Sequence, residues 1–155
     1  MAKWQLGKGQ FPAFKERMDN MIPDLMRIIM IDAYRKVMLK TPVDTGRARW
    51  GWYCSINNIN RGVPAEPPAA YRQAHDEAGR KGKSIQPYYA VPSNRALEAF
   101  ITVKASDTLY IANSVPYIKR LNEGYSTQAP ARFVESALLS VAQNMQNYLN
   151  RTGRG

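Results

Sequence analysis

Apolar residues in the first quarter of the chain follow the period of an α-helix. Between Phe11 and Lys40 they recur at spacings of three and four residues, with polar residues in the positions between them. This spacing places the apolar side chains on one stripe, which predicts a helix with a single buried face. The predicted stripe consists of Phe14, Met18, Met21, Leu25, Ile28 and Ile29.

Two prolines shape this predicted helix. Pro23 has no amide donor and its ring clashes with the preceding turn, so we expect a kink or a break there and a more regular half from Pro23 to Lys40. Pro42 then ends the helix, because the residue before a proline disfavours helical geometry.

A turn and an aromatic strand follow. Proline, aspartate and glycine succeed one another in Thr41–Arg47, where Asp44 can accept backbone donors and Gly46 can adopt a positive φ, so this segment is predicted to turn. The next residues alternate with a period of two, which predicts a strand. It would place Trp50, Trp52 and Cys54 on one side and Tyr53 and Ser55 on the other.

The segment Asn57–Ser93 has a different composition. It contains five of the ten prolines and many basic residues, and its middle, residues 74–84, has almost no apolar residue. These features predict a long extended loop without a core of its own. Loops of this length are usually functional or disordered.

The remaining residues predict alternating short elements that end in a long helix. Ser93 is a suitable N-cap for a short helix, and Pro130 suits the first turn of the last one. The first of these elements is a helix over Asn94–Val103, with Leu97, Phe100 and Ile101 on its apolar face. A strand over Asp107–Asn113 follows, and then a helical turn over Tyr117–Asn122 that Gly124 closes. The chain ends in a helix over Pro130–Leu149 and a disordered tail over Thr152–Gly155. The apolar stripe of the last helix would hold Phe133, Val134, Ala137, Leu138, Val141, Met145 and Tyr148.

These elements predict one α+β domain over residues 1–155. A small antiparallel sheet, built from the strands at Trp50–Ser55 and Asp107–Asn113 with further strands from the loop, would pack against the first and last helices. A chain of 155 residues suits one domain.

Charge and composition narrow the function classes. Lys and Arg number 22 against 12 Asp and Glu, so the net charge is +10 and an anionic neighbour is expected. Cys54 is the only cysteine, so no internal disulfide can form, and its aromatic surroundings favour a packed side chain. The sequence contains no run of 18 apolar residues, so no membrane span is predicted. Residues 1–9 have no apolar core of the kind found in signal peptides.

Candidate catalytic material is sparse. His75, the only histidine, lies in the polar loop and reads as solvated, and no cluster of histidine and cysteine predicts a zinc site. Asp44 and Glu123 could pair as two carboxylates, but each lies beside a turn glycine, where a structural acceptor role is commoner. A basic stretch at 79–83 could meet phosphates through charge, and the aromatic clusters at Trp50–Tyr53 and Tyr88–Tyr89 could stack bases or lie in the core.

Two segments are more distinctive than these. The first, Thr41–Trp50, reads Thr-Pro-Val-Asp-Thr-Gly-Arg-Ala-Arg-Trp and joins the first helix to the aromatic strand. The second, Ile111–Pro130, contains Asn-Ser-Val-Pro-Tyr and then Glu-Gly-Tyr-Ser-Thr-Gln-Ala-Pro before the last helix. In these motifs and in their order the chain resembles the neck and tail-completion proteins of long-tailed double-stranded DNA phages. The resemblance covers most of the chain outside the 57–93 loop.

The resemblance implies a structural virion protein without catalysis or a cofactor. Proteins of this family assemble as six-fold or twelve-fold rings between the head connector and the tail, with DNA passing through the channel. The implied partners are further copies of the chain, adjacent neck and tail proteins, and the DNA, and the implied location is the virion after assembly in the host cytoplasm. The 57–93 loop would reach a neighbouring subunit or another ring and become ordered only on assembly.

The residues carried by the two motifs are expected to shape the protomer and border its interface. The two turns should lie near each other, with Asp44 or Glu123 facing Arg47 and with Asn113, Glu123 and Ser126 acting as local acceptors. The candidate motif residues are Pro42, Asp44, Thr45, Gly46, Arg47, Asn113, Pro116, Tyr117, Glu123, Gly124, Ser126, Gln128, Ala129 and Pro130. The candidate contacts to DNA or a partner are Arg80, Lys81 and Lys83.

Two other function classes stay open on the residues alone. A small nucleic-acid-binding protein acting as a monomer would fit the basic balance, the Arg80–Lys83 stretch and the aromatic residues. An enzyme, such as a nuclease or a peptidoglycan hydrolase, would need a metal site or a paired acid and base, and the sequence presents neither clearly.

Overall fold

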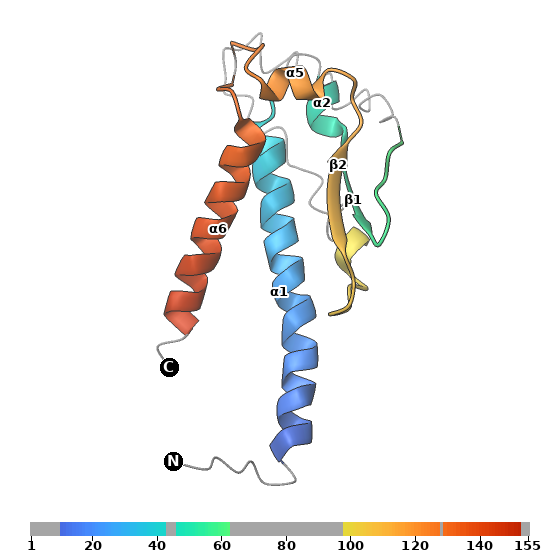
Figure 1. The fold of residues 1–155 in the computed structure, drawn as a ribbon, viewed down its shortest axis with the longest axis vertical. Helices are drawn as coiled ribbons and strands as arrows, with labels where there is room; N and C mark the ends of the chain where they lie inside the picture. The colour runs from blue at the N-terminus through green and yellow to red at the C-terminus, as the bar shows by residue number, and fades with distance from the viewer. Residues whose placement is uncertain (1–9, 43–45, 63–97, 128, 153–155) are drawn as a thin grey trace, which may run out of the picture.

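The computed structural model describes residues 10–42, 46–62, 98–127 and 129–152 (Figure 1). The elements in chain order are α1 (Gln10–Lys40), α2 (Arg47–Trp50), β1 (Trp52–Ile56), β2 (Leu109–Asn113), α5 (Ile118–Asn122) and α6 (Phe133–Thr152). The helix α1 lies between the other two layers, with α6 along one side and the two-stranded sheet along the other (Figure 1). The predicted α+β fold, with a long N-terminal helix, an antiparallel sheet and a C-terminal helix, is confirmed.

The core forms where these layers meet. Tyr34 on α1, Phe100 beside the sheet and Phe133 at the start of α6 are completely buried, and together they join all three layers. Val37, Met38, Trp52 and Ala137 complete the buried cluster. Burying a large apolar side chain contributes about 1.5–3 kcal/mol, so this cluster is a main source of the stability of the fold.

The sheet is an antiparallel pair in the register Trp52 opposite Asn113 through Ile56 opposite Leu109. Trp52 and Cys54 lie on the face that packs against the core, as the alternation predicts, and Ile111 packs there from the other strand. Trp50 is a correction, because it ends the short helix α2 and the strand begins two residues later. The described residues contain no third strand, and most of the 57–93 loop, residues 63–93, lies outside them.

The helix α1 differs from its prediction in two ways. It runs unbroken through Pro23, because proline removes one hydrogen bond while its φ of about −65° remains helical. The expected buried stripe is also wrong at Met21 and Ile28, which are about half exposed, since the buried face is formed instead by Ala33, Tyr34, Val37 and Met38.

Several boundaries in the C-terminal half also move. The helix predicted to reach Val103 ends at Phe100. The last helix begins at Phe133, because Arg132 has a left-handed backbone with φ 61°, so Pro130 precedes the helix and is exposed. The same helix continues to Thr152, where a disordered tail was expected. Leu138 and Tyr148, both predicted to be buried, are about half exposed.

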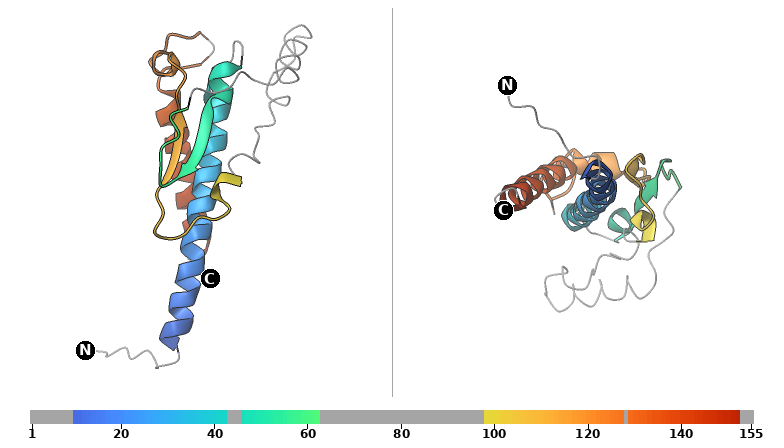
Figure 2. Two further views of the ribbon diagram at one scale, coloured as in Figure 1. Left: turned by 90° about the vertical axis from the view of Figure 1, so that its right-hand side faces the viewer. Right: turned by 90° about the horizontal axis from the view of Figure 1, so that it is seen from below.

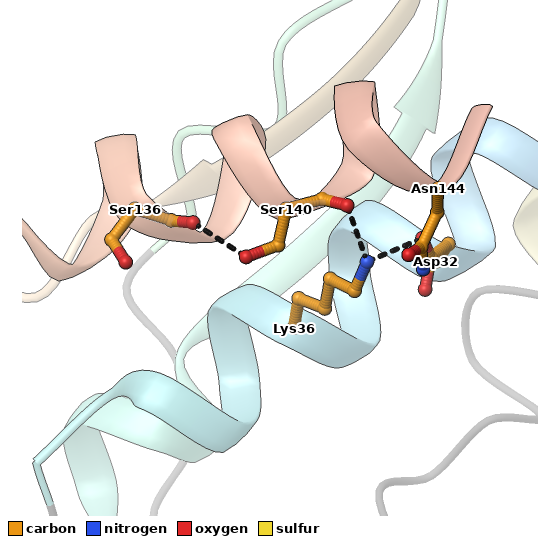
Figure 3. Close-up of polar contacts among 5 residues, drawn as sticks. All are labelled: Asp32, Lys36, Ser136, Ser140 and Asn144. Atoms are coloured by element: carbon orange, nitrogen blue, oxygen red, sulfur yellow. Dashed lines mark hydrogen bonds and ion pairs between the residues drawn. The ribbon is translucent and has the colours of Figure 1, made fainter. Parts of the chain in front are cut away.

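A polar seam joins α1 to α6 (Figure 3). The ammonium of Lys36 lies 2.9 Å from a carboxylate oxygen of Asp32 and donates to the backbone carbonyl of Ser140, also at 2.9 Å. The amide of Asn144 donates to the same Asp32 oxygen at 3.2 Å, and Lys40 donates to the hydroxyl of Ser136 at 2.6 Å. These bonds fix the two helices along their length.

Replacing Lys36 by methionine should lower the free energy of unfolding by about 1–2 kcal/mol. The change keeps the apolar stem but removes the charged donor shared by Asp32 and the Ser140 carbonyl, and a hydrogen bond to a charged group contributes about 1.5–3 kcal/mol. Urea denaturation measures the loss. Lys104→Met is the control, because the side chain of Lys104 is exposed, and it should change stability little; an equal effect of the two variants would contradict the role of the seam.

The open end of the sheet is closed by side-chain bonds. The amide of Asn57 donates to Asp107 at 2.9 Å, and the Asn57 side-chain oxygen accepts from the Thr108 amide at 2.8 Å. The second oxygen of Asp107 accepts from the Lys104 amide at 2.7 Å. The bond from Asn57, and next the bond from Lys104, lower the pKa of Asp107.

This lowered pKa predicts a pH dependence of stability. Because the Asp107 carboxyl has a lower pKa in the folded chain than in the unfolded chain, its contribution is present above about pH 4 and is lost as the pH falls through the folded value. Asp107→Asn should therefore reduce the loss of stability between about pH 5 and pH 3. Asn57→Ala should have the same effect, measured by thermal unfolding across that range. A wild-type pH profile in Asp107→Asn would contradict the prediction.

Candidate functional site

The first motif segment lies at the C-terminal end of α1 and is mainly internal. Thr41 is 1% exposed, and its hydroxyl donates to the Val37 carbonyl at 2.7 Å while accepting the indole N–H of Trp52 at 2.9 Å. Pro42 and Gly46 are buried, and Gly46 has φ 81°, as expected for the turn. This segment therefore fixes the path from α1 through α2 into β1.

A buried arginine holds this corner together. Arg49, only 6% exposed, donates through Nη2 to the carbonyls of Leu39 at 3.1 Å and of Thr41 at 2.9 Å. These carbonyls belong to the end of α1, where backbone acceptors have no partner within the helix and a positive charge is favourable. The role of Arg49 was not predicted from the sequence. The signal available was a second basic residue, seven residues after the Pro42 that ends the helix.

The two motif segments meet at Asn113. Its side-chain amide donates to the Ala48 carbonyl at 2.7 Å, and its side-chain oxygen accepts the Val115 amide at 3.0 Å. The second bond is the local acceptor role predicted for Asn113. The first confirms that the two segments lie near each other, at the end of the molecule where α2 and α5 are found (Figure 1).

The second motif segment is more exposed than the first. Pro116, Tyr117, Glu123 and Gly124 are exposed, whereas Val115 between the strand and α5 is buried. Gly124 closes α5 with φ 96°, as predicted, and its amide donates to the Leu121 carbonyl at 3.2 Å. Glu123 was expected to accept backbone donors near Gly124, but the amides of Gly124 and Tyr125 donate to the Leu121 and Arg120 carbonyls, and the Glu123 carboxylate lies 3.9 Å from Lys119.

The exposed end of this segment carries an aromatic contact. The guanidinium of Arg120 lies 5.2 Å from the centre of the Tyr125 ring, and Tyr125 is 71% exposed. Such a cation–π pair limits the positions that the tyrosine can adopt. Ser126 and Ala129 that follow are half-buried, and Pro130 is exposed.

The start of α6 is capped from a distance by Asn122. The Asn122 side-chain oxygen accepts the Val134 amide at 3.0 Å, its amide donates to Glu135 at 2.9 Å, and its backbone carbonyl accepts the Arg132 amide at 2.6 Å. The bond from Asn122 is the main reason that the pKa of Glu135 is lowered. The capping role of Asn122 was not predicted from the sequence. The available signal was that the residue before α6 is an arginine, which cannot cap a helix in the way that Ser, Thr, Asp or Asn can, so the cap had to come from elsewhere.

Other candidates fall outside the described residues. These are Asp44 and Thr45 of the first motif, Gln128 of the second, His75, and the basic residues Arg80, Lys81 and Lys83. The contact expected between Asp44 and Arg47 therefore stays a prediction, and Arg47 is half-buried in α2.

Metal-ligating side chains do not cluster in the described part of the chain. Within it, no three His, Cys, Asp or Glu side chains gather as a metal site would require. None of the helices it contains combines the length and the apolar character that crossing a membrane requires.

Comparison with protein-family models, with curated proteins and with solved structures gives no match for this chain. The two motif segments and their geometry therefore carry the functional argument.

Proposed function

We propose that this chain is a structural protein of the neck of a long-tailed phage, joining the head connector to the tail as a homo-oligomeric ring around the DNA channel. The observation that carries the proposal is the junction of the two motif segments. Their sequences and order resemble the tail-completion family, and the Asn113 amide joins the second segment to Ala48 in the first at 2.7 Å.

The two motif segments would have different roles. The first is buried around Thr41 and Arg49 and so determines the shape of the protomer. The second exposes Tyr117, Tyr125 and Pro130, and the helix α5 within it lies at the same end of the molecule as α2 (Figure 1). Exposed tyrosines are enriched in protein interfaces, so this end is the surface proposed to meet the adjacent neck or tail protein.

The charge of the chain supports a position beside DNA. Each copy has a net charge of +10, and six or twelve copies would concentrate positive charge around the channel. Binding to phosphates through such charge is independent of base sequence, which suits a channel through which a whole genome passes.

The decisive experiment removes the gene from the phage that encodes it and examines the particles produced. The proposal expects filled heads and separate tails in electron micrographs, with joining restored when the wild-type gene is supplied. Mass spectrometry should find the chain in wild-type particles, at a stoichiometry of six or twelve. Intact infectious particles that lack the protein would overturn the proposal.

A monomeric nucleic-acid-binding protein is the second candidate, and the +10 charge is the observation that favours it. It predicts tight binding of a short DNA duplex by the monomer at physiological salt, lost when Arg80, Lys81 and Lys83 are replaced by glutamine. Binding that is weak in the monomer and that rises only in the assembled ring would favour the neck protein.

A further inference from the structure

The first turns of α1 project beyond the rest of the described fold. Tyr148 on α6 lies at the level of Ile28, so α6 ends near Asp24, and Gln10–Asp24 continues for about 22 Å at 1.5 Å per residue. We call Gln10–Asp24 the projecting half of α1. No element of the described part of the chain lies beside it (Figures 1 and 2).

This projecting half needs cover. A helix of about 15 residues is marginal in water on its own, and Pro23 removes one hydrogen bond within it, because it has no amide to donate to the Asp19 carbonyl. Met21 is about half exposed. In the sequence, the apolar positions Phe14, Met18 and Met21 recur at spacings of four and three, whereas Lys15, Glu16 and Asp19 between them are exposed.

An apolar groove lies next to it, between α1 and α6. It has a volume of about 390 Å³ and is lined on α1 by Ile28 and Ile29 and on α6 by Val141, Met145 and Tyr148. Asp32 and Arg35 are the charged residues of its lining, and Asp32 is already bonded to Lys36. The groove therefore presents apolar surface with few free charges to bind a polar ligand.

The outer surface of α6 extends this apolar region. Leu138 and Leu149 are about half exposed and, with Met145 of the groove, recur at spacings of seven and four along one side of the helix. Between Glu135 and Arg151 the sequence of α6 has no charged residue, although the chain as a whole has a net charge of +10. A depletion of charged residues is typical of the core of a protein interface.

We infer that the groove between α1 and α6 is occupied by the projecting half of α1 from a second copy of this chain. The chain carries both an apolar stripe that needs cover and a groove whose lining is mainly apolar. They cannot cover each other within one molecule, because both include parts of the same continuous helix α1. Between two copies the stripe of one chain can enter the groove of the other, and each chain supplies one stripe and one groove.

Charge also favours a second copy. The projecting half carries Lys15 and Arg17 against Glu16, Asp19 and Asp24, a balance of −1, whereas the chain as a whole is +10. It is therefore a segment that a basic copy of the same chain attracts and does not repel. This inference adds a subunit contact to the proposed ring, and it rests on the proposed neck function for the number of copies. Each copy gives a helix to one neighbour and accepts one from the other, and such head-to-tail contacts can close into a ring.

The first test places a charge in the groove. Ile28→Lys and Tyr148→Lys replace half-exposed side chains, so the fold should tolerate them, which circular dichroism verifies. Each should weaken self-association of the full chain at least tenfold in analytical ultracentrifugation. Gln143→Lys is the matched control, because Gln143 is exposed and lies two residues from both Val141 and Met145, on the opposite side of α6. It adds the same charge and should leave self-association unchanged.

The second test traps the contact. A Met21→Cys chain is mixed with a Tyr148→Cys chain, both carrying Cys54→Ala, and is treated with a short bifunctional thiol reagent. The inference expects a cross-linked pair that contains one chain of each kind. A Gln143→Cys chain in place of Tyr148→Cys should give no such pair. Absence of the pair, or unchanged self-association in Ile28→Lys, would overturn the inference.

The experiments distinguish a failure of the groove contact from a failure of the neck function. A ring of six or twelve that persists in Ile28→Lys and forms no cross-link would keep the neck function and overturn the groove contact. A cross-linked assembly of only two copies would support the groove contact and overturn the ring. A wild-type chain that remains monomeric at high concentration would overturn the groove contact, and the gene-removal experiment would still decide the function.

Discussion

Replacing Arg49 by methionine should lower the free energy of unfolding by about 3 kcal/mol, the largest effect that we expect from a polar residue of this chain. The substitution keeps the apolar stem but leaves the carbonyls of Leu39 and Thr41 without their charged donor. A hydrogen bond to a charged group contributes about 1.5–3 kcal/mol, and a buried acceptor left without a donor adds a desolvation penalty.

Urea denaturation measures this effect. The midpoint of unfolding should fall, while the slope of the free energy of unfolding against urea concentration stays the same. Arg49→Lys should recover only part of the loss, because an ammonium lies on a shorter side chain than Nη2, which donates both bonds, and is more strongly hydrated than a guanidinium. Arg132→Met is the control, as the Arg132 side chain is 80% exposed. If Arg49→Met is no more harmful than Arg132→Met, the corner at the end of α1 does not depend on the buried charge.

Replacing Gly124 by alanine should lower the free energy of unfolding by about 2–3 kcal/mol. Gly124 has φ 96°, and a left-handed backbone costs an L-residue about 1–2 kcal/mol. In addition, a new Cβ would lie 2.9 Å from the Cβ of Ala131, and overpacking of this kind costs about 1–3 kcal/mol. Both effects act where α5 leads toward α6.

A second variant separates the two causes. In Gly124→Ala/Ala131→Gly the close contact disappears while the backbone strain remains, so part of the lost stability should return, as measured in a double-mutant cycle. Gly62→Ala is the matched control, because a Cβ there meets only the flexible side chain of Asn60, at 3.1 Å. Equal effects at Gly62 and Gly124 would show that neither the strain nor the contact with Ala131 matters.

The periodic elements could be predicted from the sequence because their signals are local. The alternation around Trp52 and Cys54 gives the strand and its core face, and Gly124 gives the end of α5. Pro23 misleads, because its helical φ matters more within a 31-residue helix than its lost hydrogen bond.

The rest could not be predicted, for a physical reason. A helical period shows which residues share a face, but not which other element covers that face, so Met21 and Ile28 were expected to be buried. Asn122 caps a helix eleven residues further along the chain, and Arg49 bonds to carbonyls eight and ten residues earlier. Such bonds depend on the folded path and not on the local sequence.

The packing of α6 against α1 has a consequence for how the chain is made. Lys36 bonds to Ser140, Lys40 to Ser136 and Asp32 to Asn144, which are pairs separated by about 100 residues. Contacts between such distant residues form slowly, and here they are absent until the ribosome has released residues 133–152. A chain interrupted before that point keeps one side of α1 bare and lacks a wall of the groove. Only chains that include α6 can complete the packing of α1, so the fold itself selects against chains interrupted before that helix.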